Sequence, residues 1–360
     1  MPNVSILIAY RNESLRIEPL LESLALLDFP KEKLEILMVD DHSIDDSQDK
    51  ILAAVEKHQL PVRFFSLPEG KTGKKAALAM AKEQASFDFL FFTDADVILP
   101  PGWVRNMLAC QQNSNAGMVC GEVVVNYKKS SFQILQVYEQ AALVALSASR
   151  LLEDKPFLCN GASYMVTKKA LDTIHLPEYW EKVPGGDDVM LLHAMHKAKH
   201  PIVYCRIPGT KVQTAALTDF DLVHQRIRWA GKIFLGNDMG NLIPAILVWS
   251  FHAVQLYFYF GLIHRFDNLG FHYDLLFIGA LSIPLRGLWE GLLIKDFMPD
   301  SSSALNEILI NKQPANAKST TGSIMTASFL APIYSIYVVL LGLLVLGYRR
   351  FVWKGRDYSV

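Results

Sequence analysis

Apolar runs that alternate with helix-like stretches over the first hundred residues constrain the fold more than any other feature of this chain. Four runs have the length of buried strands: residues 4–9, 34–39, 62–67 and 87–93. Three stretches with helical spacing or an alanine-rich composition lie between them: residues 14–27, 49–58 and 74–85. Strands that alternate with helices pair in parallel, with helices on both faces of the sheet. We therefore expect an α/β fold with a mostly parallel, Rossmann-like sheet.

Polar side chains follow three of the predicted strands at the points where these strands end. Residues 10–13 (YRNE) follow the first strand, Asp40 and Asp41 the second, and Asp94 and Asp96 the fourth. In such sheets, ligands bind beyond the carboxyl ends of the strands. The sequence thus predicts a ligand site at this edge of the sheet.

Asp94 and Asp96 are candidate metal ligands. One residue separates them, so in extended backbone their side chains would point to the same side. Carboxylate oxygens suit Mg²⁺ or Mn²⁺, which keep positions open for phosphate oxygens. We expect one aspartate to bind the metal directly and the other to act through water or a ribose. The ten histidines are scattered and the four cysteines lack metal-site spacing, which favours buried thiols in a reducing compartment.

Asp40 and Asp41 allow two interpretations. A carboxylate here can accept a hydrogen bond from a base N–H or a ribose hydroxyl. Alternatively it belongs to the loop, where Ser43, Asp45 and Asp46 could also cap the next helix. We expect one of the two aspartates to contact a nucleotide and the other to be structural.

The stretch GKTGKK at residues 70–75 precedes the alanine-rich helix. It does not meet the GxxxxGK[ST] pattern of a P-loop. Glycines and lysines at the start of a helix can still contact a diphosphate. The alternative for Lys71 and Lys75 is a solvated, charged turn.

Two adjacent acids follow two glycines in GGDD, residues 185–188. Neighbouring residues on a helix diverge by roughly 100°, so Asp187 and Asp188 are predicted to have different roles. One could orient an acceptor hydroxyl while the other takes its proton. The alternative is a helix N-terminus whose acids complement the helix dipole.

The motif QRIRW at residues 225–229 places Gln225, Arg228 and Trp229 on one face of a predicted helix. A guanidinium suits bidentate contact with phosphate, and an indole offers a flat apolar surface for a sugar or a lipid head group. Arg226 and Lys232 add positive charge. The alternative is a basic anchor helix at a membrane surface.

Three long apolar segments follow: residues 241–263, 275–294 and 324–347. Each has the ~20 residues that a membrane crossing needs, although a buried core helix is the alternative for each. The second segment carries Arg286 and Glu290, four residues apart. These charges predict either a neutralised pair inside a bundle or an interfacial, re-entrant segment.

The positions of charged residues predict how the chain is oriented in the membrane. The basic tail at residues 349–356 should be cytoplasmic. Residues 1–3 run into the first strand without the pattern of a signal peptide, so we expect the N-terminal part to be cytoplasmic as well. Two full crossings then follow, with 275–294 as the irregular segment. The net charge of −1 argues against nucleic acid as a partner.

As a set, the motifs resemble the GT-A glycosyltransferases of the large inverting family 2, which includes cellulose, chitin and hyaluronan synthases. Ceramide glucosyltransferase shares QxxRW as well. The resemblance covers about residues 3–235 and rests on the following stretches: ILIAYRNES (6–14), VDDHS (39–43), GKKAAL (73–78), TDADV (93–97), NGASYMV (160–166), GGDDV (185–189) and QRIRW. The tail WKGR (353–356) is similar to that of many bacterial membrane-bound members.

The resemblance implies a GT-A catalytic domain at residues 1–235, a membrane region at 236–360, a nucleoside-diphosphate sugar donor and a bound Mg²⁺ or Mn²⁺. It implies these roles: Tyr10, Arg11, Glu13, Asp40 or Asp41, Lys74 and Asp94 for the nucleotide sugar; Asp94 and Asp96 for the metal; Asp188 as base with Asp187 and Arg228 beside it; Asn160, Gly161, Gln225 and Trp229 for the acceptor.

The expected protein is a membrane-bound inverting glycosyltransferase, in a bacterial inner membrane, that acts on a lipid-linked or glycan acceptor beside membrane lipid. Two departures from the family pattern stand out. Asp187 occupies the place of a longer carboxylate, and the membrane segments are few, so we do not expect a polymer-conducting channel in a single chain. Processive or single addition stays open, because processive synthases and ceramide glucosyltransferase, which adds one sugar, share QxxRW. The alternatives are a membrane-tethered, Mg²⁺-dependent phosphotransfer or phosphohydrolase protein, in which QRIRW and NGASYMV have no role, and a catalytically silent scaffold.

Overall fold

The computed structural model describes residues 1–126, 131–176, 180, 185–231, 239–264, 319–347, 350–353 and 356–359. The described residues fall into two compact units. The first contains Met1–Asn126 and Leu143–Ala215, and the second contains the other described residues. The functional domains expected at 1–235 and 236–360 stay a prediction, because a compact unit is not a functional domain.

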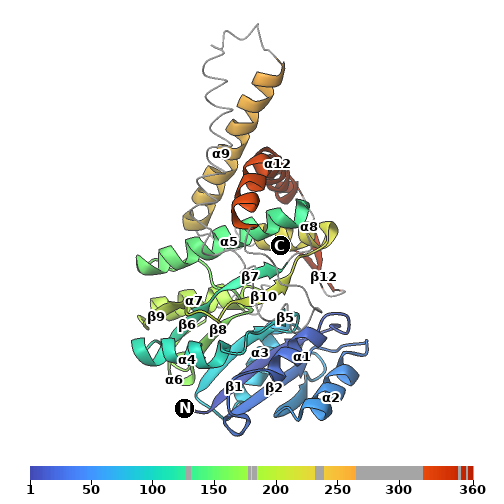
Figure 1. The fold of residues 1–360 in the computed structure, drawn as a ribbon, viewed down its shortest axis with the longest axis vertical. Coiled ribbons are helices and arrows are strands. Elements are labelled where there is room, and N and C mark those ends of the chain that lie inside the picture. Colours follow the sequence, from blue (N-terminus) through green and yellow to red (C-terminus); the bar gives the residue numbers. More distant parts are fainter. Residues whose placement is uncertain are drawn as a thin grey trace. The chain divides into compact units, whose positions relative to one another are not determined.

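A seven-stranded sheet forms the core of the first unit, in the order β3-β2-β1-β4-β8-β6-β9 (Figure 1). Its strands are β1 (Val4–Tyr10), β2 (Leu34–Asp40), β3 (Val62–Ser66), β4 (Phe89–Asp94), β6 (Met118–Gly121), β8 (Tyr164–Thr167) and β9 (Ile202–Cys205). β1 pairs in parallel with β2 and β4, and β2 pairs in parallel with β3. The parallel sheet and its four predicted strands are confirmed, with small shifts at their ends.

Helices cover both faces of this sheet, as the alternation predicted. On one face α1 (Glu18–Ala25), α2 (Ser47–His58) and α4 (Trp103–Ser114) pack in an apolar cluster with Ile6 and Ile8 of β1. On the other face α3 (Lys74–Gln84), α6 (Lys168–Leu171) and α7 (Asp187–Lys197) pack with Leu7. Consecutive strand residues point to opposite faces, which is why Ile6, Leu7 and Ile8 divide between the two clusters.

Helix α1 begins later than the predicted residue 14. Pro19 is the second residue of α1. A proline fits the first turn of a helix, but in the interior it removes a hydrogen bond and clashes with the carbonyl four residues earlier. The chain instead makes a tight turn before α1, in which the amides of Arg16 and Ile17 donate to the carbonyl of Glu13 (2.8 and 2.9 Å).

The strands after β4 were not predicted. β8 lies antiparallel to both β4 and β6, so the residues that precede β8 reach the carboxyl edge of β4. A separate three-stranded sheet is formed by β5 (Val97–Ile98), β10 (Val212–Ala215) and β7 (Val123–Asn126). A short 3₁₀ helix, η1 (Lys31–Lys33), leads into β2.

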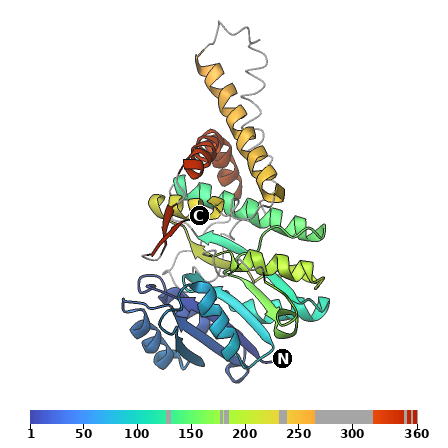
Figure 2. The same cartoon turned by 180° about the vertical axis from the view of Figure 1, so that it is seen from behind.

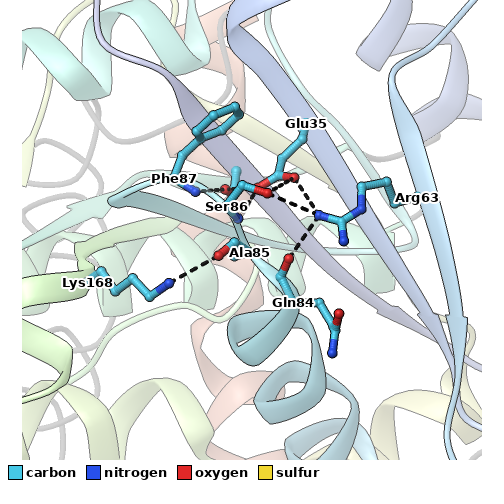
Figure 3. A network of polar contacts seen from close by, with 8 residues as sticks. Glu35, Arg63, Gln84, Ala85, Ser86, Phe87 and Lys168 are labelled. Carbon is cyan, nitrogen blue, oxygen red and sulfur yellow. Dashed lines mark hydrogen bonds and ion pairs between the residues drawn. The ribbon is translucent and has the colours of Figure 1, made fainter.

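At the amino edge of the large sheet, a buried carboxylate joins the starts of three strands (Figure 3). Glu35 on β2 accepts hydrogen bonds from the hydroxyl of Ser5 on β1 (2.6 Å) and from the guanidinium of Arg63 on β3 (2.9 Å). It also accepts from the amide and the hydroxyl of Ser86, which precedes β4 (2.6 and 3.1 Å). The carboxylate thus fixes the relative positions of four neighbouring segments.

The second unit contains helices and a hairpin: α8 (Asp219–Gly231), α9 (Met239–His264), α12 (Ser319–Gly347), β11 (Arg350–Trp353) and β12 (Arg356–Ser359). The first part of α5 (Ser131–Leu152) also belongs to it. α12 packs against α9, and Figure 2 shows both, in red and orange. His252 and Gln255 of α9 hydrogen-bond with the buried hydroxyl of Ser335 of α12 (3.0 and 3.3 Å). Large apolar side chains of α9 and α12 are exposed: Ile246, Leu247, Val248, Phe251, Leu340 and Leu343.

No helix within the described ranges combines the length and the hydropathy that a bilayer crossing requires. The crossings predicted at residues 241–263 and 324–347 overlap α9 and α12 and therefore gain no support here. The predicted irregular segment at 275–294 lies outside the described residues.

Candidate active site

Asp40 ends β2 at the carboxyl edge of the sheet, Asp41 follows it, and both are buried. Asp40 accepts hydrogen bonds from the amide (3.0 Å) and the hydroxyl of Ser43, so it folds its own loop. The carbonyl of Tyr10, at the end of β1, accepts from the amide of Asp41 (3.0 Å). Burial and then the charge of Asp40 raise the pKa of Tyr10, so its phenol stays neutral. Asp40 therefore fits the structural role that the sequence left open for one of the pair.

The loops after β1 and β2 are tied together. The guanidinium of Arg11 donates to the backbone oxygens of Asp41 and His42, the latter at 2.8 Å. The amide of Glu13 donates to the hydroxyl of Ser47 at 2.7 Å. Arg11, which the resemblance placed at the nucleotide, is thus engaged in joining two loops of the site.

Lys74 lies at the centre of the acidic residues of this edge. Its Nζ is 2.6 Å from Oδ1 of Asp94, at the end of β4, and 3.6 Å from Oδ2 of Asp187, in the first turn of α7. That Asp187 oxygen is buried, and within the described residues it accepts no hydrogen bond. Burial alone would lower the pKa of Lys74, but Asp187, Asp94 and Asp188 raise it above its ordinary value. The ammonium is therefore the charge that keeps three neighbouring carboxylates together.

Gly161 closes this group from the turn that precedes β8. A Cβ atom there would lie 3.0 Å from Nζ of Lys74 and 3.2 Å from Oδ2 of Asp188. The side chain of Asn160 accepts from the amide of Ala162 (3.0 Å) and so holds the turn that presents Gly161. The sequence interpretation assigned Lys74, Asp94, Asp188 and Gly161 to one site, and the structure brings these four residues together.

Asp94 and Asp96 have the chemistry of a divalent metal site. Their side chains are 35% and 30% exposed, and Arg16 lies 3.6 Å from Oδ2 of Asp96 and 3.1 Å from Oε2 of Glu13. Mg²⁺ is bound by one or two carboxylates together with water and substrate phosphates, so two half-exposed carboxylates fit it. Groups of three or more candidate protein ligands are absent from the part of the chain that the structure describes. The donor set therefore suits a metal that arrives with a phosphate ligand.

The QRIRW helix, α8, belongs to the second unit. Arg226 is buried there, its guanidinium donates to the carboxylate of Glu139 on α5 and to the side chain of Gln225, and it lies 4.4 Å from the ring centre of Trp229. Sequence reasoning treated Arg226 only as added positive charge. The distant acid that pairs with it, Glu139, carried no local signal that could have revealed the contact. Arg228 is half-buried on the same helix.

Parts of this chain are similar to known proteins. Residues 5–173 match the family model described as "Glycosyl transferase family 2". Poly-beta-1,6-N-acetyl-D-glucosamine synthase of Staphylococcus epidermidis is 26% identical over 229 residues, 63% of this chain and 53% of that protein. The synthase of Staphylococcus aureus strain COL is 26% identical over 235 residues, 64% of this chain and 54% of its own length. This chain thus spans about half the length of the curated relatives it matches.

One solved structure shares the fold over most of the chain. The mannosyltransferase PcManGT from Pyrobaculum calidifontis, in complex with GDP-Man and Mn²⁺, superposes with a TM-score of 0.51 at 16% identity. The match covers 96% of this chain and 87% of that one. At this level of identity, the similarity concerns the fold alone.

Proposed function

We propose, on the premise that residues 5–173 form a glycosyltransferase family 2 domain, that the chain transfers a sugar from a nucleoside diphosphate to a hydroxyl of a lipid-linked or glycan acceptor. The observation that carries the proposal is the group of Asp94, Asp187 and Asp188 around Lys74 at the carboxyl edge of the sheet. Such an edge is where an α/β sheet binds its ligands.

Asp188 acts as the general base of this reaction. It lies in the first turn of α7, with its Oδ2 3.2 Å from the position that a Cβ atom at residue 161 would take. It takes the proton of the acceptor hydroxyl, and that oxygen forms a bond to the anomeric carbon. The bond from this carbon to the diphosphate breaks, and the electron pair leaves with the diphosphate. A single displacement of this kind inverts the anomeric carbon.

Asp94 and Asp96 would hold the Mg²⁺ or Mn²⁺ ion, which supplies positive charge where the leaving diphosphate becomes more negative. Lys74 neutralises Asp94 and Asp187 and keeps both in place. Tyr10, Glu13 and Asp41 lie at the ends of the strands or in the loops that follow them, where a nucleotide would bind. In this proposal Asn160 and Gly161 contact the acceptor, and the sequence resemblance assigns Gln225, Arg228 and Trp229 to the acceptor as well.

Membrane lipid is the proposed surroundings of the second unit. The exposed faces of α9 and α12 carry large apolar side chains, whereas their contact contains His252, Gln255 and Ser335. A soluble helix pair shows the reverse arrangement, with its apolar stripe inside. Such a surface would suit contact with membrane lipid or with the lipid part of an acceptor.

The test is a donor screen on the purified full chain. UDP-N-acetylglucosamine comes first, because the curated relatives named above are N-acetylglucosamine polymer synthases. Labelled sugar should pass to a lipid or glycan acceptor with release of nucleoside diphosphate, and chelation of divalent metal should stop the transfer. Release of phosphate from simple phosphate esters without sugar transfer would instead support the phosphohydrolase alternative and overturn the proposal.

A further inference from the structure

Lys75, the second residue of α3, contacts the chain on both sides of the candidate base. Its Nζ donates to the backbone oxygen of Trp180 (2.6 Å) and lies 4.4 Å from the centre of the Trp180 ring. It also lies 3.6 Å from the sulfur of Met190 on α7. Trp180 precedes Asp187 and Asp188 in the sequence, and Met190 follows them. One ammonium therefore contacts both flanks of the acidic pair.

The two lysines at the start of α3 divide their contacts. Neighbouring residues on a helix diverge by roughly 100°, so they can reach different partners. Lys74 contacts the carboxylates of Asp94 and Asp187, and Lys75 contacts the segment and the helix that carry Asp187 and Asp188. The start of α3 thus contacts the acidic side chains through Lys74 and the residues on either side of Asp187 and Asp188 through Lys75.

Each contact of Lys75 has a recognised physical basis. A carbonyl oxygen at 2.6 Å is a strong acceptor for an ammonium, and the face of an indole attracts a cation held within about 6 Å of its centre. Lys75 is half-buried, so these contacts operate with little competition from water. The three partners named here are a backbone oxygen, an indole and a thioether of the chain itself, which gives Lys75 a role other than the diphosphate contact that its sequence position suggested.

We propose that Lys75 is a positioning residue that holds the start of α7 against the start of α3, and so sets the place of Asp188 relative to Lys74 and Asp94. The positional part stands on the contacts alone, whereas the effect on catalysis rests on the proposed glycosyltransferase function. A direct role of Lys75 in binding the donor is the competing explanation.

The charge of Lys75 adds a pH dependence. Burial lowers the pKa of Lys75 to about 8, although the nearby Asp187 and Asp188 act in the opposite direction. The adjacent Lys74 stays protonated, because its carboxylate partners raise its pKa. Above pH 8, therefore, Lys75 loses its proton and its attraction to the indole, while the contacts of Lys74 persist.

The first experiment measures position without activity. Hydrogen exchange of the full chain is followed for peptides that cover the first turn of α7, in the wild type and in Lys75→Met. Lys82→Met is the matched control, since Lys82 lies on the same helix and pairs with Asp172 (2.9 Å) instead. We expect exchange in this turn to accelerate about tenfold or more in Lys75→Met and to stay unchanged in Lys82→Met. Equal exchange in all three proteins would overturn the proposal.

The second experiment measures catalysis. With the donor identified by the screen, Lys75→Met should lower kcat about tenfold and change the donor KM by less than about threefold, and Lys75→Arg should restore part of kcat. In Lys75→Arg the wild-type decline of kcat above pH 8 should disappear. A rise in donor KM with unchanged kcat would make Lys75 a donor ligand and overturn the proposal. If Lys75→Met does not fold, two other measurements replace it. A lower kcat in Trp180→Ala and the absence of the decline above pH 8 in Lys75→Arg would support the proposal, and wild-type behaviour in both would overturn it.

The two experiments separate two kinds of failure. A wild-type chain without sugar transfer would refute the proposed function, but the exchange result would still decide whether Lys75 holds α7. Normal transfer together with unchanged exchange and unchanged kcat in Lys75→Met would refute the positioning role alone.

Discussion

The two edges of the seven-stranded sheet hold buried carboxylates in different ways. At the amino edge, Glu35 accepts four hydrogen bonds from Ser5, Arg63 and Ser86. At the carboxyl edge, one oxygen of Asp187 is buried without a hydrogen bond from any residue that the structure describes, 3.6 Å from the ammonium of Lys74. Buried polar atoms are almost always hydrogen-bonded, because an unpaired one costs free energy. The comparison therefore supports a structural role for the amino edge and fits the ligand chemistry that we propose for the carboxyl edge.

The largest expected effect is a loss of turnover from a substitution at the carboxyl edge. Asp188→Asn keeps the size of the side chain but removes the base, so turnover should fall by ~100-fold or more. The rate of release of nucleoside diphosphate measures this effect, and donor binding by calorimetry should be retained. Near-normal turnover with intact binding would rule out Asp188 as the base.

A substitution at the amino edge should lower stability and leave activity largely unchanged. Glu35→Ala leaves the donors of Ser5 and Ser86 without their acceptor, and we expect the free energy of unfolding to fall by about 2 kcal/mol. Urea denaturation measures it, and kcat below the transition should stay within about twofold of wild type. A loss of kcat as large as that of Asp188→Asn would show that the edges are not functionally separate.

The pH dependence of stability sharpens the same contrast. Burial would raise the pKa of Glu35, but the hydrogen bonds from Ser5, Ser86 and Arg63 outweigh it and bring the pKa below its ordinary value of 4.5. A lowered folded-state pKa contributes stability above the ordinary value, and that stability is lost as the pH falls through the folded-state pKa. The stability difference between wild type and Glu35→Gln should thus be full at pH 7 and shrink below pH 4.5. An equal difference at both pH values would contradict this reasoning.

The smallest expected effect is on kcat, from a methyl group added at Gly161 beside Lys74. In Gly161→Ala the new methyl group would press on Nζ of Lys74 and Oδ2 of Asp188, at 3.0 and 3.2 Å. Both atoms end flexible side chains and can move by a few tenths of an ångström, so kcat should fall by about threefold with little loss of stability. Gly347→Ala, with no atom within 4 Å of its new methyl group, is the control. Equal kcat in both variants would show that the close approach of residue 161 to Lys74 and Asp188 does not affect turnover.

Much of this contrast could be predicted from local sequence. Buried strands read as apolar runs, and acids directly after them must lie at the carboxyl edge, so Asp94 and the four parallel strands were accessible. The start of α1 was mispredicted because the leucine spacing was given more weight than Pro19. Which partner a strand of four residues such as β6 or β8 selects depends on packing between distant segments, which no local pattern records.

The contacts that join side chains distant in the sequence were harder to predict. A lysine at a helix start suggested a phosphate contact, yet Lys74 contacts Asp94 twenty residues away and Lys75 contacts Trp180. Arg226 and Glu139 are 87 residues apart. Ion pairs of this kind depend on the finished fold, because complementary charges are too common in a sequence for one pair to be selected.

The late place of β8 in the sequence has a consequence for the order of folding. β1, β2, β3 and β4 all lie within residues 4–94, whereas β8 begins at Tyr164. Synthesis proceeds from the N-terminus, so the four parallel strands are available for pairing before β8 has been made. Gly161 and α7 would therefore reach Lys74 late, and a nascent chain would acquire its half of the sheet well before it acquires a competent catalytic centre.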